Sequence, residues 1–239
     1  MYAGLRNDER QGVNMNKPYI ICHMMAAIDG RIDCGMTEKM QGVKEYYSTL
    51  AALKATAFVS GKVTAELEMA LPGSYHAKNM EALWQEGFSK KVQAAEYNVV
   101  VDTMGSLLWS EHKGRESALI VITSEKVSKE YLTYLDSRNI SWIACGKEKI
   151  DLARASAILH DEFGVERMAI VGGGHINAGF LDAGLLDEVS VLLAPGIDGR
   201  GGMAAMFDGL PMDREPYQLK LESVKPFDDG AVWLRYKVK

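Results

Sequence analysis

MAIVGGGHINAGF, residues 168–180, is the stretch that decides the fold. An apolar run, residues 168–171, leads into three consecutive glycines, and a segment that can form a helix, residues 175–183, follows directly. A strand, a glycine turn and a helix in that order leave unpaired backbone N–H groups at a helix N-terminus. Because the helix dipole also favours negative charge there, such a turn suits a phosphate group. The spacing fits neither the G-x-G-x-x-G pattern nor a P-loop, so a plain turn between a core strand and a helix stays open as the alternative.

Length and composition limit the class of protein. The chain has 239 residues, enough for one large domain with a full core or for two small ones. A net charge of −5 argues against nucleic acid or an anionic membrane as the main partner. The three cysteines lack CxxC spacing and are expected to be reduced thiols in a cytoplasmic protein. The five histidines lie far apart, so no metal site is expected.

Strands and helices are expected to alternate along the middle of the chain. Apolar runs of strand length predict strands, and apolar residues at helical spacing predict helices. The expected strands are 18–27, 57–60, 97–102, 118–123, 140–145, 168–171, 188–195, 217–224 and 231–238, and the expected helices are 43–55, 79–94, 127–137, 152–163 and 175–183. This order predicts a three-layer α/β domain, with a mostly parallel central sheet flanked by helices and a C-terminal antiparallel hairpin. Residues 1–16 are expected to be a flexible arm, and residues 17–239 one domain.

Four places along the chain can meet at one site, because ligands of open α/β sheets bind outside the carboxyl ends of the strands. They are residues 26–30, the GKVT turn at 61–64, residues 102–103 and the glycine turn. Lys62 and Thr64 would offer a phosphate one ammonium group and one hydroxyl. Taken alone, Lys62 is more often a solvated surface charge, and an Asp before a Gly, such as Asp29, is most often a turn residue.

The segments AAIDGRID, SGKVTAE, VVVDTMG and VGGGHINAGFLDAGLLDEVSVLLAP together resemble the dihydrofolate-reductase-like fold. Within that fold, the chain is most similar to the reductase domain of riboflavin biosynthesis, which occurs alone or fused behind a deaminase. The resemblance covers residues 17–239 in the same order, and the glycine stretch with the run that follows it is the most specific part. The H-x-E and P-C-x-x-C patterns of zinc deaminases are absent, so a single, stand-alone reductase domain is expected.

The resemblance implies an NADPH-dependent reductase that converts the ribosylamino group of a (di)aminopyrimidine 5′-phosphate to ribitylamino. In such reductases the GKVT turn holds the cofactor phosphates, the glycine turn lies against the pyrophosphate and the nicotinamide ribose, and the end of the first strand lines the nicotinamide. A homodimer is also expected, in agreement with the apolar residues of the C-terminal hairpin. The expected cofactor residues are Ala26, Ala27, Gly61, Lys62, Thr64, Thr103, Gly173, Gly174, His175, Ile176 and Asn177.

The substrate side departs from the family pattern. These reductases usually have a Glu at the place of Gly172, and an Arg for the substrate phosphate in the region that here reads AALK, residues 51–54. Glu68 and His23 are the candidates for proton supply or substrate contact, and Asp29 for ordering its turn, although a histidine placed like His23 is more often a satisfied strand residue with a structural role. Two alternatives stay open. One is a dihydrofolate-reductase-like enzyme acting on another small heterocycle, and the other is a non-catalytic NADPH-binding relative.

Overall fold

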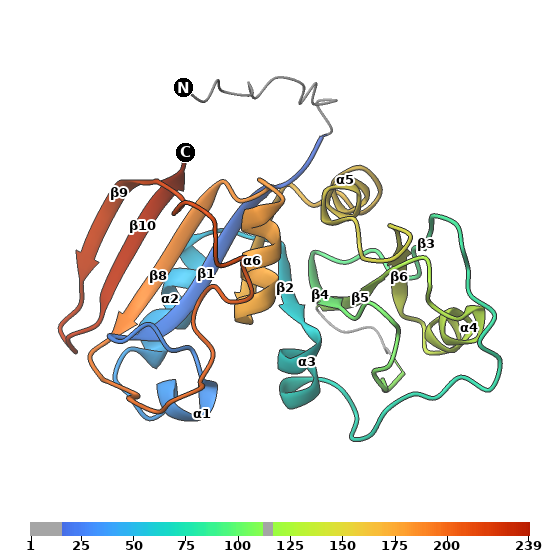
Figure 1. Cartoon of the computed structure of the whole chain (residues 1–239), viewed down its shortest axis with the longest axis horizontal. Helices are drawn as coiled ribbons and strands as arrows, with labels where there is room; N and C mark the ends of the chain where they lie inside the picture. Colours follow the sequence, from blue (N-terminus) through green and yellow to red (C-terminus); the bar gives the residue numbers. More distant parts are fainter. Residues whose placement is uncertain (1–15, 112–116) are drawn as a thin grey trace, which may run out of the picture.

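A ten-stranded sheet forms the centre of the molecule. The computed structural model describes residues 16–111 and 117–239, so the predicted N-terminal arm lies almost wholly outside the described residues. The strand order is β3-β6-β5-β4-β2-β7-β1-β8-β10-β9 (Figure 1). The strands are β1 (Tyr19–Ala27), β2 (Ala57–Gly61), β3 (Gly87–Ser89), β4 (Glu96–Val101), β5 (Ser117–Thr123), β6 (Ser141–Ala144), β7 (Arg167–Gly172), β8 (Glu188–Ala194), β9 (Leu219–Pro226) and β10 (Val232–Val238).

The seven strands from β6 to β8 run parallel to one another, whereas β3, β9 and β10 pair antiparallel. Strand β1 lies between β7 and β8, and every residue of its YIICHMMAA sequence after Tyr19 is buried. A near-continuous apolar run is typical of a parallel strand that is covered on both faces. The predicted mostly parallel sheet with a C-terminal antiparallel hairpin is therefore confirmed.

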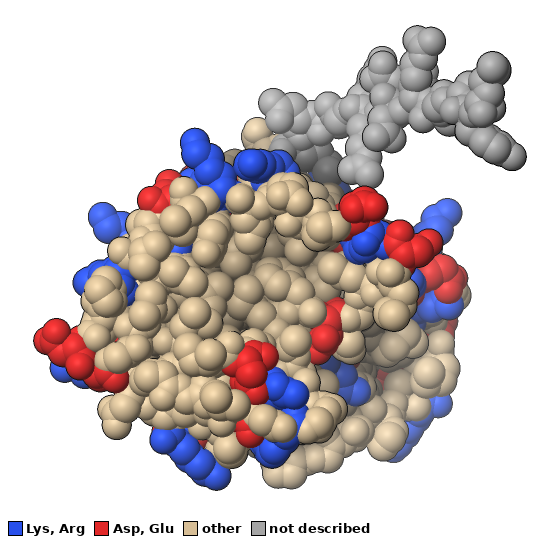
Figure 2. All heavy atoms as spheres, turned by 60° about the vertical axis from the view of Figure 1, so that its left-hand side comes forward, with Lys and Arg blue, Asp and Glu red and all other residues tan. Residues whose placement is uncertain are grey.

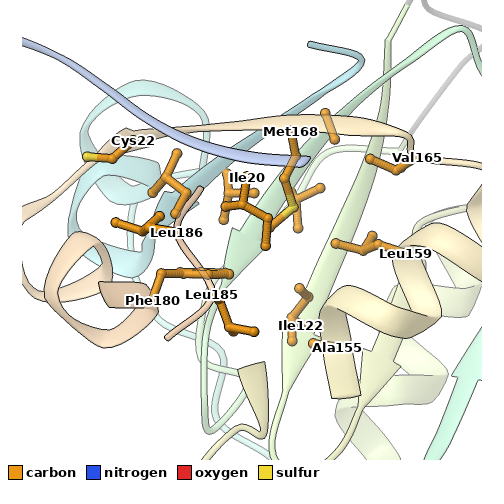
Figure 3. Packing of buried hydrophobic residues seen from close by; sticks show 14 of the residues in the cluster. Ile20, Cys22, Ile122, Ala155, Leu159, Val165, Met168, Phe180, Leu185 and Leu186 are labelled. Atoms are coloured by element: carbon orange, nitrogen blue, oxygen red, sulfur yellow. The ribbon is translucent and has the colours of Figure 1, made fainter. Parts of the chain in front are cut away.

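Helices cover both faces of this sheet and complete three layers. The helices are α1 (Cys34–Thr37), α2 (Val43–Ala52), α3 (Lys62–Glu68), α4 (Lys129–Ser137), α5 (Leu152–Phe163) and α6 (Gly174–Asp182). Helices α5 and α6 pack on one face, where residues such as Leu159 and Phe180 meet Ile20 and Met168 of the strands (Figure 3). On the other face, α4 packs through Tyr131 against β4 to β6, and α2 packs over β1 and β8.

One predicted helix is wrong. Residues 79–94 form no helix and contain only the short strand β3, which pairs with β6. The preceding chain is tied to its surroundings instead, because the Glu130 carboxylate accepts hydrogen bonds from the backbone N–H groups of Lys78 and Asn79 at 3.1 and 2.7 Å. The N–H of Leu83 donates to the Val127 carbonyl at 3.0 Å. These tertiary contacts use the backbone groups that a helix would have paired internally.

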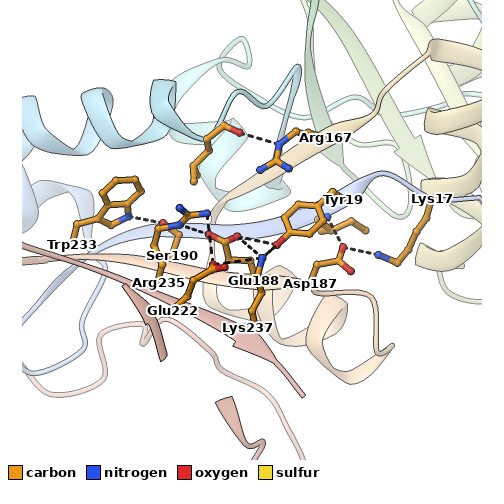
Figure 4. Close-up of polar contacts among 12 residues, drawn as sticks. Lys17, Tyr19, Arg167, Asp187, Glu188, Ser190, Glu222, Trp233, Arg235 and Lys237 are labelled. Carbon is orange, nitrogen blue, oxygen red and sulfur yellow. Dashed lines mark hydrogen bonds and ion pairs between the residues drawn. The ribbon is translucent and has the colours of Figure 1, made fainter. Parts of the chain in front are cut away.

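A buried ionic network joins the amino ends of β1 and β8 to β10 (Figure 4). The Glu188 side chain is fully buried, and its carboxylate accepts hydrogen bonds from Arg235 Nε at 2.6 Å and from the Tyr19 hydroxyl at 2.9 Å. Burial alone would raise the pKa of Glu188, but the hydrogen bonds from Arg235 and Tyr19 outweigh it and the pKa is lowered. Lys237 completes the network at 3.3 Å. The network lies at the end of the sheet opposite the glycine turns.

In the part of the chain that the structure describes, no helix has both the length and the apolar character to cross a membrane.

Candidate active site

Two glycine turns lie side by side at the carboxyl ends of the neighbouring parallel strands β2 and β7. Gly61 is the N-cap of α3, and Gly173 is the N-cap of α6. A Cβ placed on Gly172 would lie 2.9 Å from Thr64 Oγ1, and one placed on Gly61 would lie 3.7 Å from Ile176 Cγ2. The sheet therefore brings the GKVT and GGGHIN segments into direct contact, as the sequence predicted from their places at strand ends.

Several features of these turns suit a ligand with phosphate groups. Because a glycine N-cap has no side chain, the first-turn N–H groups of α6 are not capped by it. Two buried polar atoms beside the turns, Ser60 Oγ and Asn177 Oδ1, have no hydrogen-bond partner among the described residues. Gly174 cannot be larger, because its Cβ would lie 2.4 Å from the Ala205 carbonyl oxygen. Exposed Lys62 stands in the first turn of α3, 3.6 Å from Glu66.

A cavity of about 270 Å³ lies between α2 and α3, over β7, β2 and β4. Its charged side chains are two carboxylates, Glu38 and Glu68. The Cys34 thiol donates a hydrogen bond to Glu68 Oε1 at 3.8 Å. Burial raises the pKa of Cys34, and the Glu68 charge raises it further, so this thiol stays protonated at neutral pH. The full lining is Met24, Met25, Ile32, Cys34, Thr37, Glu38, Val43, Tyr46, Tyr47, Leu50, Phe58, Glu68, Asn98 and Val171.

The other predicted site residues from β1 and β4 lie at the same edge of the sheet as the glycine turns. Ala26 and Ala27 are buried at the end of β1. Asp29 orders its turn, because its carboxylate accepts hydrogen bonds from the Gly199 N–H at 2.8 Å and from Arg31 at 2.5 Å. The hydrogen bond from the Gly199 N–H is the largest cause of the lowered pKa of Asp29, and Arg31 lowers it further. Thr103 follows β4, and its carbonyl accepts from Ser124 N and Oγ, both at 3.0 Å.

His23 lies away from the cavity lining, buried beneath α2. Its ring stacks on Tyr46 with centroids 4.9 Å apart. His23 Nδ1 lies within hydrogen-bond distance of Ser190 Oγ, at 2.9 Å, and Ser190 Oγ also accepts a hydrogen bond from Trp233 Nε1 at 2.7 Å. Burial lowers the pKa of His23 to about 4. These contacts are those of a neutral structural histidine, and the geometry gives no support to its predicted part in proton supply.

Sequence reasoning missed most of the cavity wall. Tyr46, Tyr47 and Leu50 belong to the predicted helix 43–55, and nothing in their spacing distinguishes a packed helix face from a cavity wall. Phe58 and Val171 lie in predicted strands, where successive side chains point to opposite faces of the sheet. Which of the two faces borders the cavity becomes clear only when the positions of the covering helices are known.

Residues 18–233 match the family model described as the RibD C-terminal domain. The chain belongs to this family. Among solved structures, it is similar to a pyrimidine reductase-like protein from Corynebacterium diphtheriae, with a TM-score of 0.69, 20% sequence identity, and coverage of 93% of this chain and 92% of that one. Both glycine turns lie within the residues that match this family model.

Two further proteins similar to this RibD C-terminal domain are named for a reductase activity. A 2,5-diamino-6-ribosylamino-4(3H)-pyrimidinone 5′-phosphate reductase from Methanothermobacter thermautotrophicus is 30% identical over 125 residues, which is 52% of this chain. The match spans 57% of that protein's length. A diaminohydroxyphosphoribosylaminopyrimidine deaminase/5-amino-6-(5-phosphoribosylamino)uracil reductase from Thermotoga maritima has a TM-score of 0.62 and 18% identity, covering 93% of this chain and 57% of that one.

Proposed function

We propose that this RibD C-terminal domain is an NADPH-dependent reductase that converts the ribosylamino group of a (di)aminopyrimidine 5′-phosphate to ribitylamino. The observation that carries the proposal is the contact between the two glycine turns beside the cavity. It offers adjacent places for a phosphate-bearing cofactor and a small substrate. The activity for which the Methanothermobacter thermautotrophicus relative is named supports the substrate class.

The residues at the turns fit a dinucleotide cofactor. The glycine cradle admits a close backbone approach, and the buried unpaired Ser60 Oγ and Asn177 Oδ1 can be satisfied by polar groups of a ligand or by water. Lys62 and Thr64 would bind phosphate, with Lys62 favouring NADPH over NADH through the extra phosphate charge. When bound, the cofactor supplies the hydride. The residues Gly173, Gly174, His175, Ile176, Asn177, Ala26, Ala27, Gly61 and Thr103 complete the proposed cofactor site.

Glu68 is the proposed proton-handling residue. Its side chain lines the cavity from α3. One of its carboxylate oxygens accepts a hydrogen bond from the Cys34 thiol, with 3.8 Å between the sulfur and the oxygen. A carboxyl group placed at the wall can pass a proton to the substrate as the reaction proceeds, with the thiol keeping its side chain oriented. The protein otherwise contributes by holding the reacting carbon in place and by limiting the access of water.

Two measurements test the proposal together. NADPH is titrated into the protein while its fluorescence and melting temperature are followed, and NADPH oxidation is then measured with the ribosylaminopyrimidine phosphate and, separately, with dihydrofolate. We expect NADPH to raise the melting temperature and the ribosylaminopyrimidine phosphate to be reduced. Reduction of dihydrofolate alone would favour the other heterocycle alternative, and binding without turnover would favour the non-catalytic one.

We also propose a homodimer formed through the C-terminal hairpin. All eight residues of the edge strand β9 are exposed, including Leu219, Leu221 and Val224. An exposed edge strand with apolar side chains is a ready template for pairing with a second chain. With the hairpin side turned forward, Figure 2 shows a broad uncharged area bordered by charged side chains, as expected for a surface that another molecule covers.

A further inference from the structure

The cavity of the proposed active site has a negative character. Glu38 and Glu68 are its charged side chains, and within residues 16–111 and 117–239 no Lys or Arg side chain lines it. The rest of the wall is apolar or uncharged, with two methionines, two tyrosines, a phenylalanine and an asparagine. A phosphate dianion placed inside would face two carboxylates without a cation to bind it, which is electrostatically unfavourable.

Two arginines near the cavity, Arg31 and Arg200, are already engaged. Arg31 pairs with Asp29 at 2.5 Å. Arg200 bridges two carboxylates, Asp33 at 2.7 Å and Asp198 at 2.6 Å, and in doing so ties the loop after β8 to the segment before α1. A phosphate would have to displace these carboxylates before it could use either guanidinium. These two guanidinium groups therefore do not offset the negative character of the cavity lining.

The same wall suits an aminopyrimidine ring. Amino groups on such a ring are hydrogen-bond donors, and a carboxylate accepts hydrogen bonds without donating any. The flat faces of the ring can contact tyrosine rings and methionine sulfur, and Tyr46, Met24 and Met25 lie in the wall. The ring end of a ribosylaminopyrimidine phosphate thus matches the cavity, and its phosphate end does not.

Resting on the proposed function, we propose that this cavity takes the aminopyrimidine end of the substrate, with the Glu38 carboxylate as hydrogen-bond acceptor for the ring, and leaves the 5′-phosphate outside. The 5′-phosphate then contributes little to recognition, and dephosphorylated ribosylaminopyrimidines belong to the substrate class. Glu38, which lies at the end of α1 and does not contact the glycine turns, determines specificity for the ring.

The test compares kcat/KM with NADPH for the ribosylaminopyrimidine 5′-phosphate and for the same compound without its phosphate. We expect the two values to agree within about tenfold, because one charge-assisted hydrogen bond to a phosphate typically contributes about tenfold or more. A preference of more than tenfold for the phosphorylated compound overturns the proposal. If NADPH binds but neither compound is reduced, the proposed function itself fails, which is a distinct outcome.

The Glu38→Gln variant tests the role of the carboxylate. It keeps the shape of the side chain and removes its charge, so we expect kcat/KM to fall by about tenfold for both compounds, mainly through KM. The matched control is Glu45→Gln on α2, whose side chain is outside the lining, and it should leave kcat/KM unchanged. An unchanged KM in Glu38→Gln, or a change confined to kcat and the melting temperature, overturns the assignment of Glu38.

Discussion

Thr64 and Gly172 face each other across the two glycine turns, with Thr64 Oγ1 only 2.9 Å from the place where a Cβ on Gly172 would lie. This contact fixes the distance between the starts of α3 and α6. A residue larger than glycine at position 172 would need the space that the Thr64 side chain fills.

Replacing Gly172 with alanine tests this contact. The added methyl group would overlap Thr64 Oγ1 and Cγ2, and overpacking of this kind typically costs about 1–3 kcal/mol. We expect Gly172→Ala to lower the free energy of unfolding, measured in urea, by that amount and to weaken NADPH binding. Gly201→Ala is the control, since a Cβ there would meet nothing within 4 Å. Equal stability of the two variants would show that Thr64 moves aside freely.

Lys62 is predicted to recognise the extra phosphate of NADPH. Loss of one charge-assisted contact to a phosphate should weaken binding by about tenfold, because such contacts contribute about 1.5–3 kcal/mol. We expect Lys62→Ala to raise the Kd for NADPH by at least this factor and to leave the Kd for NADH nearly unchanged, as measured by fluorescence titration. Lys44→Ala, at an exposed lysine of α2, is the control. Parallel losses for both cofactors would rule out selection by Lys62.

The buried His23 predicts a loss of stability in weak acid. Its pKa is lowered to about 4 in the folded protein, so between pH 6.5 and 4 the unfolded chain binds more protons and stability falls as the pH falls. The expected loss between pH 7 and 5 is about 2 kcal/mol, a window above the usual range of carboxylate titration. We expect His23→Gln to flatten this slope in urea unfolding at several pH values. A slope that persists in the variant would assign it to other groups.

The Glu188 network predicts a large and local effect on stability. Glu188→Gln would leave Arg235 and Lys237 without their buried carboxylate, and breaking a buried ion pair typically costs about 3–5 kcal/mol. The control is Glu222→Gln, since Glu222 is partly exposed and pairs with the same two cations at 3.9 and 3.5 Å. There we expect a loss below about 1 kcal/mol. Similar losses in both variants would contradict the importance of burial.

The exposed edge strand β9 predicts how the dimer can be separated. Leu221→Lys together with Val224→Lys places two charges on the proposed contact surface, and like charges from the two chains would repel there. We expect light scattering to give twice the chain mass for the unmodified protein and the mass of one chain for the variant. Lys substitutions at exposed Val63 and Leu67 of α3 are the control and should leave the mass unchanged.

The fold could be predicted further than the site. Continuous apolar runs such as residues 20–27 predict buried parallel strands, because only a sheet covered on both faces buries such a run completely. The sequence also placed the two glycine turns at strand ends. The sequence could not predict α3 as a separate helix, because its seven residues are too few to show a helical repeat of apolar residues. The partners of His23 could not be predicted, because Tyr46 and Ser190 come from α2 and β8, whose places beside β1 the sequence does not show.

The central position of β1 has a consequence for how the chain folds during synthesis. β1 leaves the ribosome before the other strands, yet its neighbours β7 and β8 are among the later parts of the chain, and the Ile20 N–H reaches the Asp187 carboxylate across 167 positions. The apolar segment of β1 therefore stays without its neighbouring strands until most of the protein has been translated. Contacts of such high sequence separation also slow folding. Chaperone dependence should thus be concentrated in nascent chains that have passed β1 but have not yet released β8.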